Sequence, residues 1–345
     1  MRTTTSRTRT RTPRTRTTRT GTAGQRRRIL LLIVGAAVLL TGATRAAAEP
    51  SGNSVAAEHR DHDTATGPST LTTGKAVVLG LVEGATEYLP VSSTGHLLIS
   101  ERILDVGQSP AEKSVTDTYT VVIQIGAIVA VLGIFRKRFK LMLDGVLHAD
   151  PGGRSLLRSL LVAFIPAAII GKLFGDPIKE HLLRPWPVVG AWVVGGIVIL
   201  AFVANRSRFR VRIDSLQAIP PTTALAIGAA QTVALWPGTS RSFVTILAAL
   251  ALGCSMTVAV EFSFLLGFVT LSAATALELA QNGSEMMDHF GILNPIIGIV
   301  VAGVAAFASV RWMITYLERH PLTIFGWYRI ALGLGVGVLL VTQTI

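Results

Sequence analysis

The hydrophobic residues of this chain are gathered into eight apolar segments, separated by short polar stretches. They are residues 75–102, 119–135, 156–174, 186–204, 222–252, 258–280, 292–313 and 325–345. Six of them have about the length that one helix needs to cross a bilayer, roughly 17 to 25 residues. The other two, 75–102 and 222–252, are too long for one crossing, and a polar stretch with a proline interrupts each near its middle. We therefore expect each of these two to be re-entrant, with a helix, an irregular turn at membrane depth and a second helix that returns.

The charges of the connecting loops indicate which ends face the cytoplasm. Clusters of Lys and Arg follow the second and the fourth segment, and such clusters stay inside. They are Arg136, Lys137, Arg138 and Lys140, and then Arg206, Arg208, Arg210 and Arg212. Residues 282–289 contain Glu285 and Asp288 but no Lys or Arg, so we expect an outer loop there. These assignments agree only if the first broken segment enters and leaves from outside and the second from inside, with the C-terminus outside.

The two halves of the apolar region then share one plan in opposite orientation, which is typical of an inverted-topology repeat. An offset of 148 residues aligns Gly80 with Gly228, Glu83 with Gln231, and Ser92 with Ser240. We therefore predict an all-α polytopic membrane protein with two re-entrant helix–loop–helix elements and about six full transmembrane helices. Residues 74–204 form the first repeat, and residues 205–345 form the second, inverted repeat.

The first 73 residues differ in composition from the rest. Residues 1–28 alternate Arg and Thr and are too polar to bury a core, so we expect a disordered basic tail. Residues 29–48 place an apolar run and small residues after a basic flank, which fits either a signal peptide or an extra transmembrane helix. Residues 49–73 are polar and are predicted to form an external linker.

Composition supports a membrane location and limits the meaning of the net charge. Half of the 345 residues are hydrophobic and 15% are charged, with a mean hydropathy of +0.54, which lies beyond the range of soluble globular domains. The formal net charge is +12, but residues 1–28 contain ten Arg and no acid, so the remainder carries only +2. We therefore expect no nucleic-acid partner. The single cysteine, Cys254, excludes an internal disulfide and a CxxC site.

Two carboxylates precede the first break. Glu83 and Glu87 are four residues apart, so a helix presents both on one face, one turn apart. An acid near the middle of a bilayer costs about 2.5 to 3.5 kcal/mol, so a divalent cation, shared protons or a basic partner has to compensate the pair. Carboxylate oxygens suit Mg²⁺ or Ca²⁺ bound together with a substrate phosphate. The alternative is an acid pair that faces water at a helix end.

Hydroxyl groups and a histidine follow within the same break. Ser92, Ser93 and Thr94 offer hydroxyl donors where the chain turns back after a proline. His96 is close enough to act as a base toward Ser92 or Ser93, or to be the nucleophile itself. A lone interfacial histidine would be structural, but the company of acids and hydroxyls favours catalysis.

The second break combines a Pro-Gly turn with an arginine. A helix that opens after Pro237 and Gly238 presents free backbone N–H groups, which form a natural anion site. Arg241 adds a guanidinium that suits bidentate contact with phosphate oxygens. The alternative is ordinary helix capping, with an Arg241 side chain that snorkels to the interface. The residues expected to contribute to phosphate binding in the two breaks are Ser92, Thr94, Gly238, Ser240, Arg241, Ser242 and Thr245.

Gln124 and Glu261 stand alone as polar residues in otherwise apolar spans. Each either supports the site from behind or forms an interhelical hydrogen bond. We favour the structural role for both.

Residues 83–96, EGATEYLPVSSTGH, and residues 237–245, PGTSRSFVT, resemble the two signature motifs of the bacterial undecaprenyl-diphosphatase family of the bacitracin-resistance type. The resemblance runs from about Gly74 to the C-terminus, whereas residues 1–73 depart from the family pattern. It implies hydrolysis of undecaprenyl diphosphate to undecaprenyl phosphate, which recycles the lipid carrier of cell-wall synthesis, with dependence on a divalent metal. It also implies a site in the bacterial cell membrane that opens to the extracytoplasmic face. The positions that match the family's functional residues are Glu83, Glu87, Ser93, His96, Ser240, Arg241 and Thr245.

Together these features predict a phosphatase that acts on a polyprenyl diphosphate lipid within the bilayer. Glu83 and Glu87 would hold the metal ion against the diphosphate, and Arg241 would bind the terminal phosphate. The nucleophile stays open between Ser93, His96 and water. The chief alternative is a transporter or flippase of polyprenyl phosphates, because broken helices in an inverted repeat are also a transporter plan. The protein is also a candidate for a homodimer.

Overall fold

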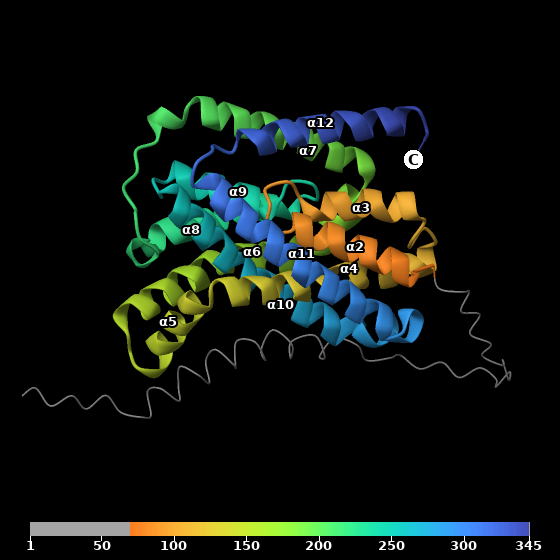
Figure 1. Ribbon diagram of the computed structural model, residues 1–345, viewed down its shortest axis with the longest axis horizontal. Helices are drawn as coiled ribbons and strands as arrows, with labels where there is room; N and C mark the ends of the chain where they lie inside the picture. Colours follow the sequence, from red (N-terminus) through yellow and green to blue (C-terminus); the bar gives the residue numbers. More distant parts are fainter. Residues whose placement is uncertain (1–69, 345) are drawn as a thin grey trace, which may run out of the picture. The chain divides into compact units, whose positions relative to one another are not determined.

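The computed structural model describes residues 70–344, and every long element within them is a helix (Figure 1). The long helices are α2 (Thr73–Thr86), α3 (Ser93–Leu104), α4 (Pro110–Ile134), α5 (Arg136–Leu147), α6 (Pro151–Leu182), α7 (Pro185–Ala204), α8 (Pro221–Gln231), α9 (Arg241–Ala251), α10 (Met256–Phe290), α11 (Leu293–Leu317) and α12 (Thr323–Val341). Short 3₁₀ helices are η1 (Arg206–Arg208), η2 (Leu216–Ala218) and η3 (Thr232–Leu235). The predicted all-α fold class is confirmed. The predictions for residues 1–28 and 29–48, and for most of the linker 49–73, lie outside the described residues.

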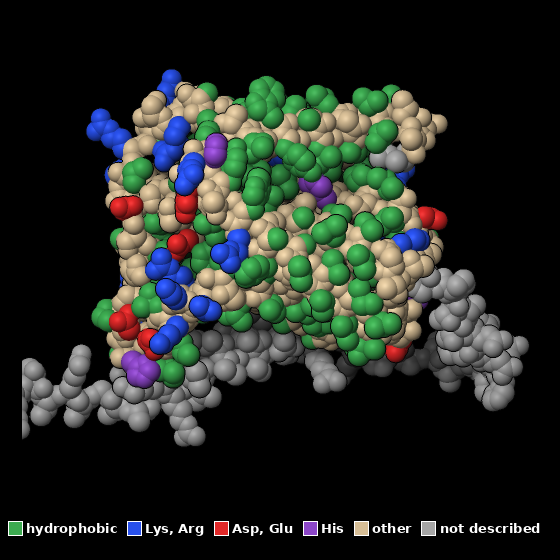
Figure 2. All heavy atoms as spheres, viewed as in Figure 1, with side chains coloured by type: hydrophobic (Ala, Val, Ile, Leu, Met, Phe, Trp, Pro, Cys, Tyr) green, Lys and Arg blue, Asp and Glu red, His purple; other side chains and the backbone are tan. Residues whose placement is uncertain are grey.

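Six helices of the described region are long and apolar enough to cross a membrane. They are α4 from Glu112 onward, α6, α7, α10, α11 and α12. In Figure 2 most charged side chains gather toward the left and right edges of the molecule, and the face between them is mainly apolar. This distribution is the one that a bilayer selects, so the prediction of a polytopic membrane protein is confirmed.

The two broken segments have the same local structure. The first consists of α2 and α3, and the second of α8, η3 and α9. Ser92 caps α3 and Ser240 caps α9, with φ of 74° and 75°, a left-handed backbone conformation that is rare for residues other than glycine. Each serine hydroxyl accepts a hydrogen bond from a backbone N–H of the helix that it opens. The two serines were aligned by the offset of the sequence repeat, and they share an unusual conformation.

Helix packing follows the same correspondence between the halves. The first broken element lies along the second half, with α2 against α11, and the second lies along the first half, with α8 against α6. Corresponding helices also pack on one another directly, α4 with α10 and α7 with α12 (Figure 1). The extensive contact of α4 with α11 departs from this pattern, because its counterpart between α10 and α6 is much smaller. This reciprocal pattern agrees with the predicted repeat. Its inverted orientation across a membrane stays a prediction.

Close helix packing in both halves depends on glycine. A Cβ atom added at Gly228 in α8 would collide with the carbonyl oxygen of Ala163 in α6, and one added at Gly80 in α2 would collide with the backbone of Gly298 in α11. Small residues let helix backbones approach, which is the usual basis of helix association in a membrane. The aligned glycines Gly80 and Gly228 therefore serve the same packing purpose.

Two stretches predicted as loops are helical in the structure. For residues 282–289 the prediction of an outer loop is wrong. Residues 282–289 form the last turns of α10, which ends only at Phe290, before Gly291. The helix continues because Gly283, Met286 and Phe290 are buried against its neighbours, so packing overrides the polar composition of this stretch. The basic cluster that begins at Arg136 forms the first turns of the short helix α5.

Gly228→Ala is expected to lower the free energy of unfolding by about 1 to 3 kcal/mol, because the added methyl group overpacks the contact between α6 and α8. Gly335→Ala is the matched control, since Gly335 is an exposed glycine of α12 with open space around its Cα. It is expected to be neutral or to gain up to about 1 kcal/mol. Thermal unfolding of both variants in one detergent measures the difference. Equal melting temperatures would contradict the close packing of α6 and α8.

Candidate active site

The turns of the two broken segments lie against one another in the interior. The hydroxyl groups of Ser242 and Ser240, at the second break, donate hydrogen bonds of 2.8 and 3.4 Å to the carbonyl oxygen of Leu89 at the first. Trp192 of α7 is fully buried, and its Nε1 donates to the carbonyl oxygen of Val91 at 3.0 Å. Side chains therefore satisfy backbone carbonyls that the first break leaves without a helical partner.

Arg329 of α12 joins the two breaks. Its side chain is fully buried, and its two terminal nitrogens donate four hydrogen bonds to backbone carbonyl oxygens. The acceptors are Pro90 at 3.2 Å, Thr239 at 3.0 Å, Ala191 at 2.8 Å and Gly238 at 3.0 Å. The guanidinium also lies 4.8 Å from the ring centroid of Phe243. One cation therefore ties both turns and α7 to the last helix.

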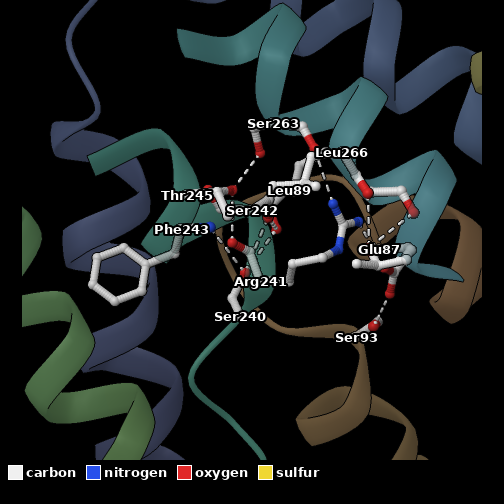
Figure 3. A network of polar contacts seen from close by, with 12 residues as sticks. Glu87, Leu89, Ser93, Ser240, Arg241, Ser242, Phe243, Thr245, Ser263 and Leu266 are labelled. Carbon is white, nitrogen blue, oxygen red and sulfur yellow. Dashed lines mark hydrogen bonds and ion pairs between the residues drawn. The ribbon is translucent and has the colours of Figure 1, made fainter. Parts of the chain in front are cut away.

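The contact between the breaks contains an ion pair (Figure 3). Nη2 of Arg241, in α9, lies 3.0 Å from Oε1 of Glu87, which caps the C-terminal end of α2. Nη1 of Arg241 donates to the carbonyl oxygen of Ser263 at 3.1 Å, and its guanidinium lies 5.1 Å from the ring centroid of Tyr88. Both partners of the ion pair are nearly buried, with side chains 12% and 7% exposed. The predicted alternative of a snorkelling Arg241 does not describe this arrangement, because the guanidinium points inward.

Ser93 completes this cluster. Its hydroxyl donates to Oε2 of Glu87, so the two carboxylate oxygens of Glu87 receive one hydrogen bond from each broken segment. The proton of Ser93 therefore points at a carboxylate. His96, one of whose expected roles was that of a base toward Ser92 or Ser93, is not its acceptor here. A serine hydroxyl next to a carboxylate that a third group orients is an arrangement suited to proton transfer.

Glu83 lies one helical turn before Glu87 and is fully buried. Neither of its carboxylate oxygens has a hydrogen-bond partner among the described residues. A buried carboxylate without a partner is strongly unfavourable unless a cation or a proton neutralises it. This orphaned group fits a hard cation, for which carboxylate oxygens are the preferred ligands.

His96 lies on α3, with its ring nitrogens in contact with Ser92 and Tyr328. Nδ1 is 2.6 Å from the carbonyl oxygen of Ser92, and Nε2 is 2.8 Å from the hydroxyl of Tyr328. The Ser92 hydroxyl caps α3 by accepting from the backbone N–H of Gly95. The structure therefore places His96 beside the first break with its Nε2 turned toward α12.

Several residues predicted to bind phosphate serve the protein's own backbone in the structure. Thr245 is fully buried, and its hydroxyl donates to the carbonyl oxygen of Arg241 at 2.8 Å and lies 2.6 Å from Oγ of Ser263. Gly238 has φ +90° and gives its carbonyl oxygen to Arg329. Thr94 is exposed at the start of α3. Of the predicted polar residues, Glu87, Ser93 and Arg241 contact one another as side chains around one point, and Ser240 and Ser242 form a separate contact between their hydroxyl groups.

Glu261 and Gln124, the lone polar residues of the apolar spans, lie in α10 and α4. Glu261 of α10 forms an ion pair with Arg138 of α5, with Nε and Oε2 2.9 Å apart. This interhelical contact is the structural role that we favoured for Glu261. Gln124 is half-buried on α4.

Arg329 and Tyr328 are absent from the residues selected from the sequence, although both contact the two breaks or His96. The sequence contains a usable signal for Arg329. It is a charged residue inside the apolar segment 325–345, and an ionisable group inside a membrane helix is functional by default. Tyr328 carries no such signal, because tyrosine is common in membrane helices near the interface.

The helices and the buried polar cluster define a polytopic membrane protein with a candidate active site between two broken helices. Residues 76–335 match the family described as bacitracin resistance protein BacA. The chain is 44% identical over 263 residues to undecaprenyl-diphosphatase 2 of Rhodospirillum rubrum, which covers 76% of this chain and 93% of that protein. It is 43% identical over 263 residues to the undecaprenyl-diphosphatase of Sorangium cellulosum, with 75% and 83% covered. The chain belongs to the bacitracin resistance protein BacA family.

Arg329→Lys is expected to lower the free energy of unfolding by about 3 kcal/mol, because an ammonium group cannot reach four carbonyl oxygens and leaves buried acceptors unsatisfied. Arg319→Lys is the control, since Arg319 is exposed beyond the end of α11 and keeps its charge in the variant. Thermal unfolding in detergent compares the two. A melting temperature of Arg329→Lys equal to that of the control would show that Arg329 does not hold the breaks together.

Proposed function

We propose that this protein hydrolyses undecaprenyl diphosphate to undecaprenyl phosphate and phosphate. The observation that carries the proposal is the convergence of Glu87, Ser93 and Arg241 from two broken helices on one buried point. Membership of the family and relatives named undecaprenyl-diphosphatase support the same activity. The product would return the lipid carrier to cell-wall synthesis. The substrate is itself a membrane lipid, which suits a site built between membrane helices.

Hydrolysis of a diphosphate requires that negative charge on the phosphoryl oxygens is stabilised and that the attacking oxygen loses a proton. Arg241 is the cation closest to the cluster, and its fixed position in a buried site makes its charge effective. In the absence of substrate this charge is balanced by Glu87. Two proton acceptors are candidates: the carboxylate of Glu87, which accepts from Ser93, and Nε2 of His96, which lies on the same helix as Ser93 and contacts Tyr328.

A divalent cation, Mg²⁺ or Ca²⁺, belongs to this proposal. Glu83 and Glu87 would hold it, because both carboxylates lie on one face of α2 and the oxygens of Glu83 are without a partner in the described part of the chain. That part contains no group of three or more His, Cys, Asp or Glu residues that could hold a metal ion. Two carboxylates suit a Mg²⁺ ion that completes its shell with substrate oxygens rather than one held in a protein cage. When bound, such an ion would neutralise charge on the phosphate groups.

The proposal also places the protein in the bacterial cell membrane, with the site open to the extracytoplasmic face. The positions of the basic clusters that begin at Arg136 and Arg206 support this orientation, because such clusters remain cytoplasmic. A homodimer stays a prediction. The alternative function, transport or flipping of polyprenyl phosphates, shares the broken-helix plan, so an activity measurement has to separate the two.

Protein purified in detergent is expected to release phosphate from undecaprenyl diphosphate, since no membrane separates two compartments and transport is impossible there. Glu83→Gln is expected to lower kcat by roughly 100-fold or more, about the loss that follows removal of one electrostatic group from an active site. The reason is that the amide keeps the shape of the side chain but not its charge. Its melting temperature should not fall, since the substitution removes an unpaired buried charge. Glu261→Gln is the control in an apolar span, and it should retain turnover. Absence of phosphate release by the parent protein would favour the transport alternative.

Chelation tests the metal. EDTA is expected to abolish phosphate release by the parent protein, and added Mg²⁺ or Ca²⁺ to restore it, because two carboxylates at a phosphate site need a cation between them. Metal binding is measured independently by Mg²⁺-dependent thermal stabilisation of the parent and of Glu83→Gln, without substrate. Full activity in EDTA together with no stabilisation would mean that the carboxylates act only as acid–base groups.

A further inference from the structure

Both ring nitrogens of His96 are in hydrogen-bond contact, and the chemistry of the partners fixes which nitrogen carries the proton. Nδ1 lies 2.6 Å from the carbonyl oxygen of Ser92. A carbonyl oxygen only accepts, so Nδ1–H is the donor. In the neutral ring Nε2 is then the acceptor, and the hydroxyl of Tyr328, 2.8 Å away, donates to it. The lone pair of Nε2 is therefore the one through which His96 can take up a proton.

The plane of the His96 ring is also fixed. The ring of Tyr328 is nearly parallel to it, with an angle of 6° and centroids 5.8 Å apart. The ring of Trp192 meets it edge-on, with an angle of 63° and centroids 5.2 Å apart. Trp192 is itself fully buried and hydrogen-bonded to the carbonyl oxygen of Val91. The imidazole is thus held by α7 on one side and by α12 on the other.

Tyr328 is held in place by the residue that follows it. Arg329 donates to four backbone carbonyls and so fixes the rotation and the height of α12 beside both breaks. Tyr328 is 44% exposed as a residue, and its hydrogen bond with Nε2 of His96 lies at an exposed position. The phenol is therefore a positioned donor that a substrate is able to displace from Nε2.

We propose that Tyr328 is a positioning residue for the phosphatase reaction. The Ser92 carbonyl fixes the tautomer of His96 with the proton on Nδ1, and the Tyr328 hydroxyl holds the Nε2 lone pair in the direction from which a proton is taken up during hydrolysis. This inference rests on the proposed function. It adds to the site a residue from the last helix of the chain, far in sequence from both broken segments.

The test is Tyr328→Phe, which retains the ring that packs on His96 and removes only the hydroxyl. The expected result is a 10- to 100-fold loss of kcat, about the loss that follows from misplacing a catalytic group, with KM and melting temperature little changed. Reaction of His96 with diethyl pyrocarbonate, followed by mass spectrometry, is expected to be faster in the variant. The hydroxyl no longer occupies the Nε2 lone pair, which is the nucleophile in that modification.

Tyr316→Phe is the matched control. Tyr316 packs on His320 with ring centroids 4.5 Å apart and an angle of 11°, so it is a second tyrosine with a parallel histidine ring. Its substitution is expected to leave kcat and the modification rate of His96 unchanged. A nonspecific effect of losing a phenol from the protein would appear in both variants.

The outcomes separate this proposal from the proposed function. Undiminished kcat in Tyr328→Phe, or an unchanged rate of His96 modification, would overturn the role of Tyr328. If kcat falls and the melting temperature also falls clearly below that of the parent, Tyr328 acts only in packing, which also overturns the proposal. If the parent protein releases no phosphate, the proposed function fails, and the modification rate of His96 alone decides whether Tyr328 occupies Nε2.

Discussion

A helix that breaks inside a membrane leaves backbone carbonyl and N–H groups without partners, and no water is present in the hydrocarbon to take their place. The rest of this structure depends on how those groups are satisfied. Arg329 supplies four donors to carbonyl oxygens at the two breaks and α7. Ser92 and Ser240 cap the helices that follow. Because Arg329 belongs to α12, the carbonyl oxygens of Pro90, Thr239 and Gly238 find their donor only when that helix is packed against both breaks.

The buried charges of the site are also paired across the two breaks. Glu87 and Arg241 neutralise one another across the two breaks, and Ser93 takes the remaining oxygen of Glu87. Glu83 is left with a buried carboxylate that accepts no hydrogen bond from the described residues, and Arg241 is the cation that attracts it. A substrate that carries phosphate groups would compete with Glu87 for Arg241. A divalent cation would bind and neutralise the carboxylates of Glu83 and Glu87. In the proposed reaction, binding would exchange one set of buried ion pairs for another and would expose no free charge to the bilayer.

The fold class was predictable from the sequence because the thickness of the bilayer sets the length of each apolar segment, and charged residues are kept in the loops outside it. It singled out Glu83, Glu87, Ser93 and Arg241 because charged and hydroxyl groups in an apolar segment require a reason, and the structure brings Glu87, Ser93 and Arg241 into contact. It was wrong at residues 282–289, where burial of Met286 and Phe290 extends a helix through a polar stretch. The partners of His96 were beyond it as well, since the contact with Tyr328 spans 232 residues and depends on the rotation of α12. Tertiary contacts of this kind leave no periodic pattern in a single sequence.

The position of Arg329 near the end of the chain has a consequence for biosynthesis. The first broken element leaves the ribosome early, but the carbonyl oxygen of Pro90 meets its donor only after α12 has been made. Glu87 likewise waits for Arg241 before its charge is paired. The first half therefore inserts with its turn unfinished and reaches its final form only when the last helix docks. Until α12 is in place, the carbonyl oxygen of Pro90 needs water or another donor, because an unpaired carbonyl in hydrocarbon is costly.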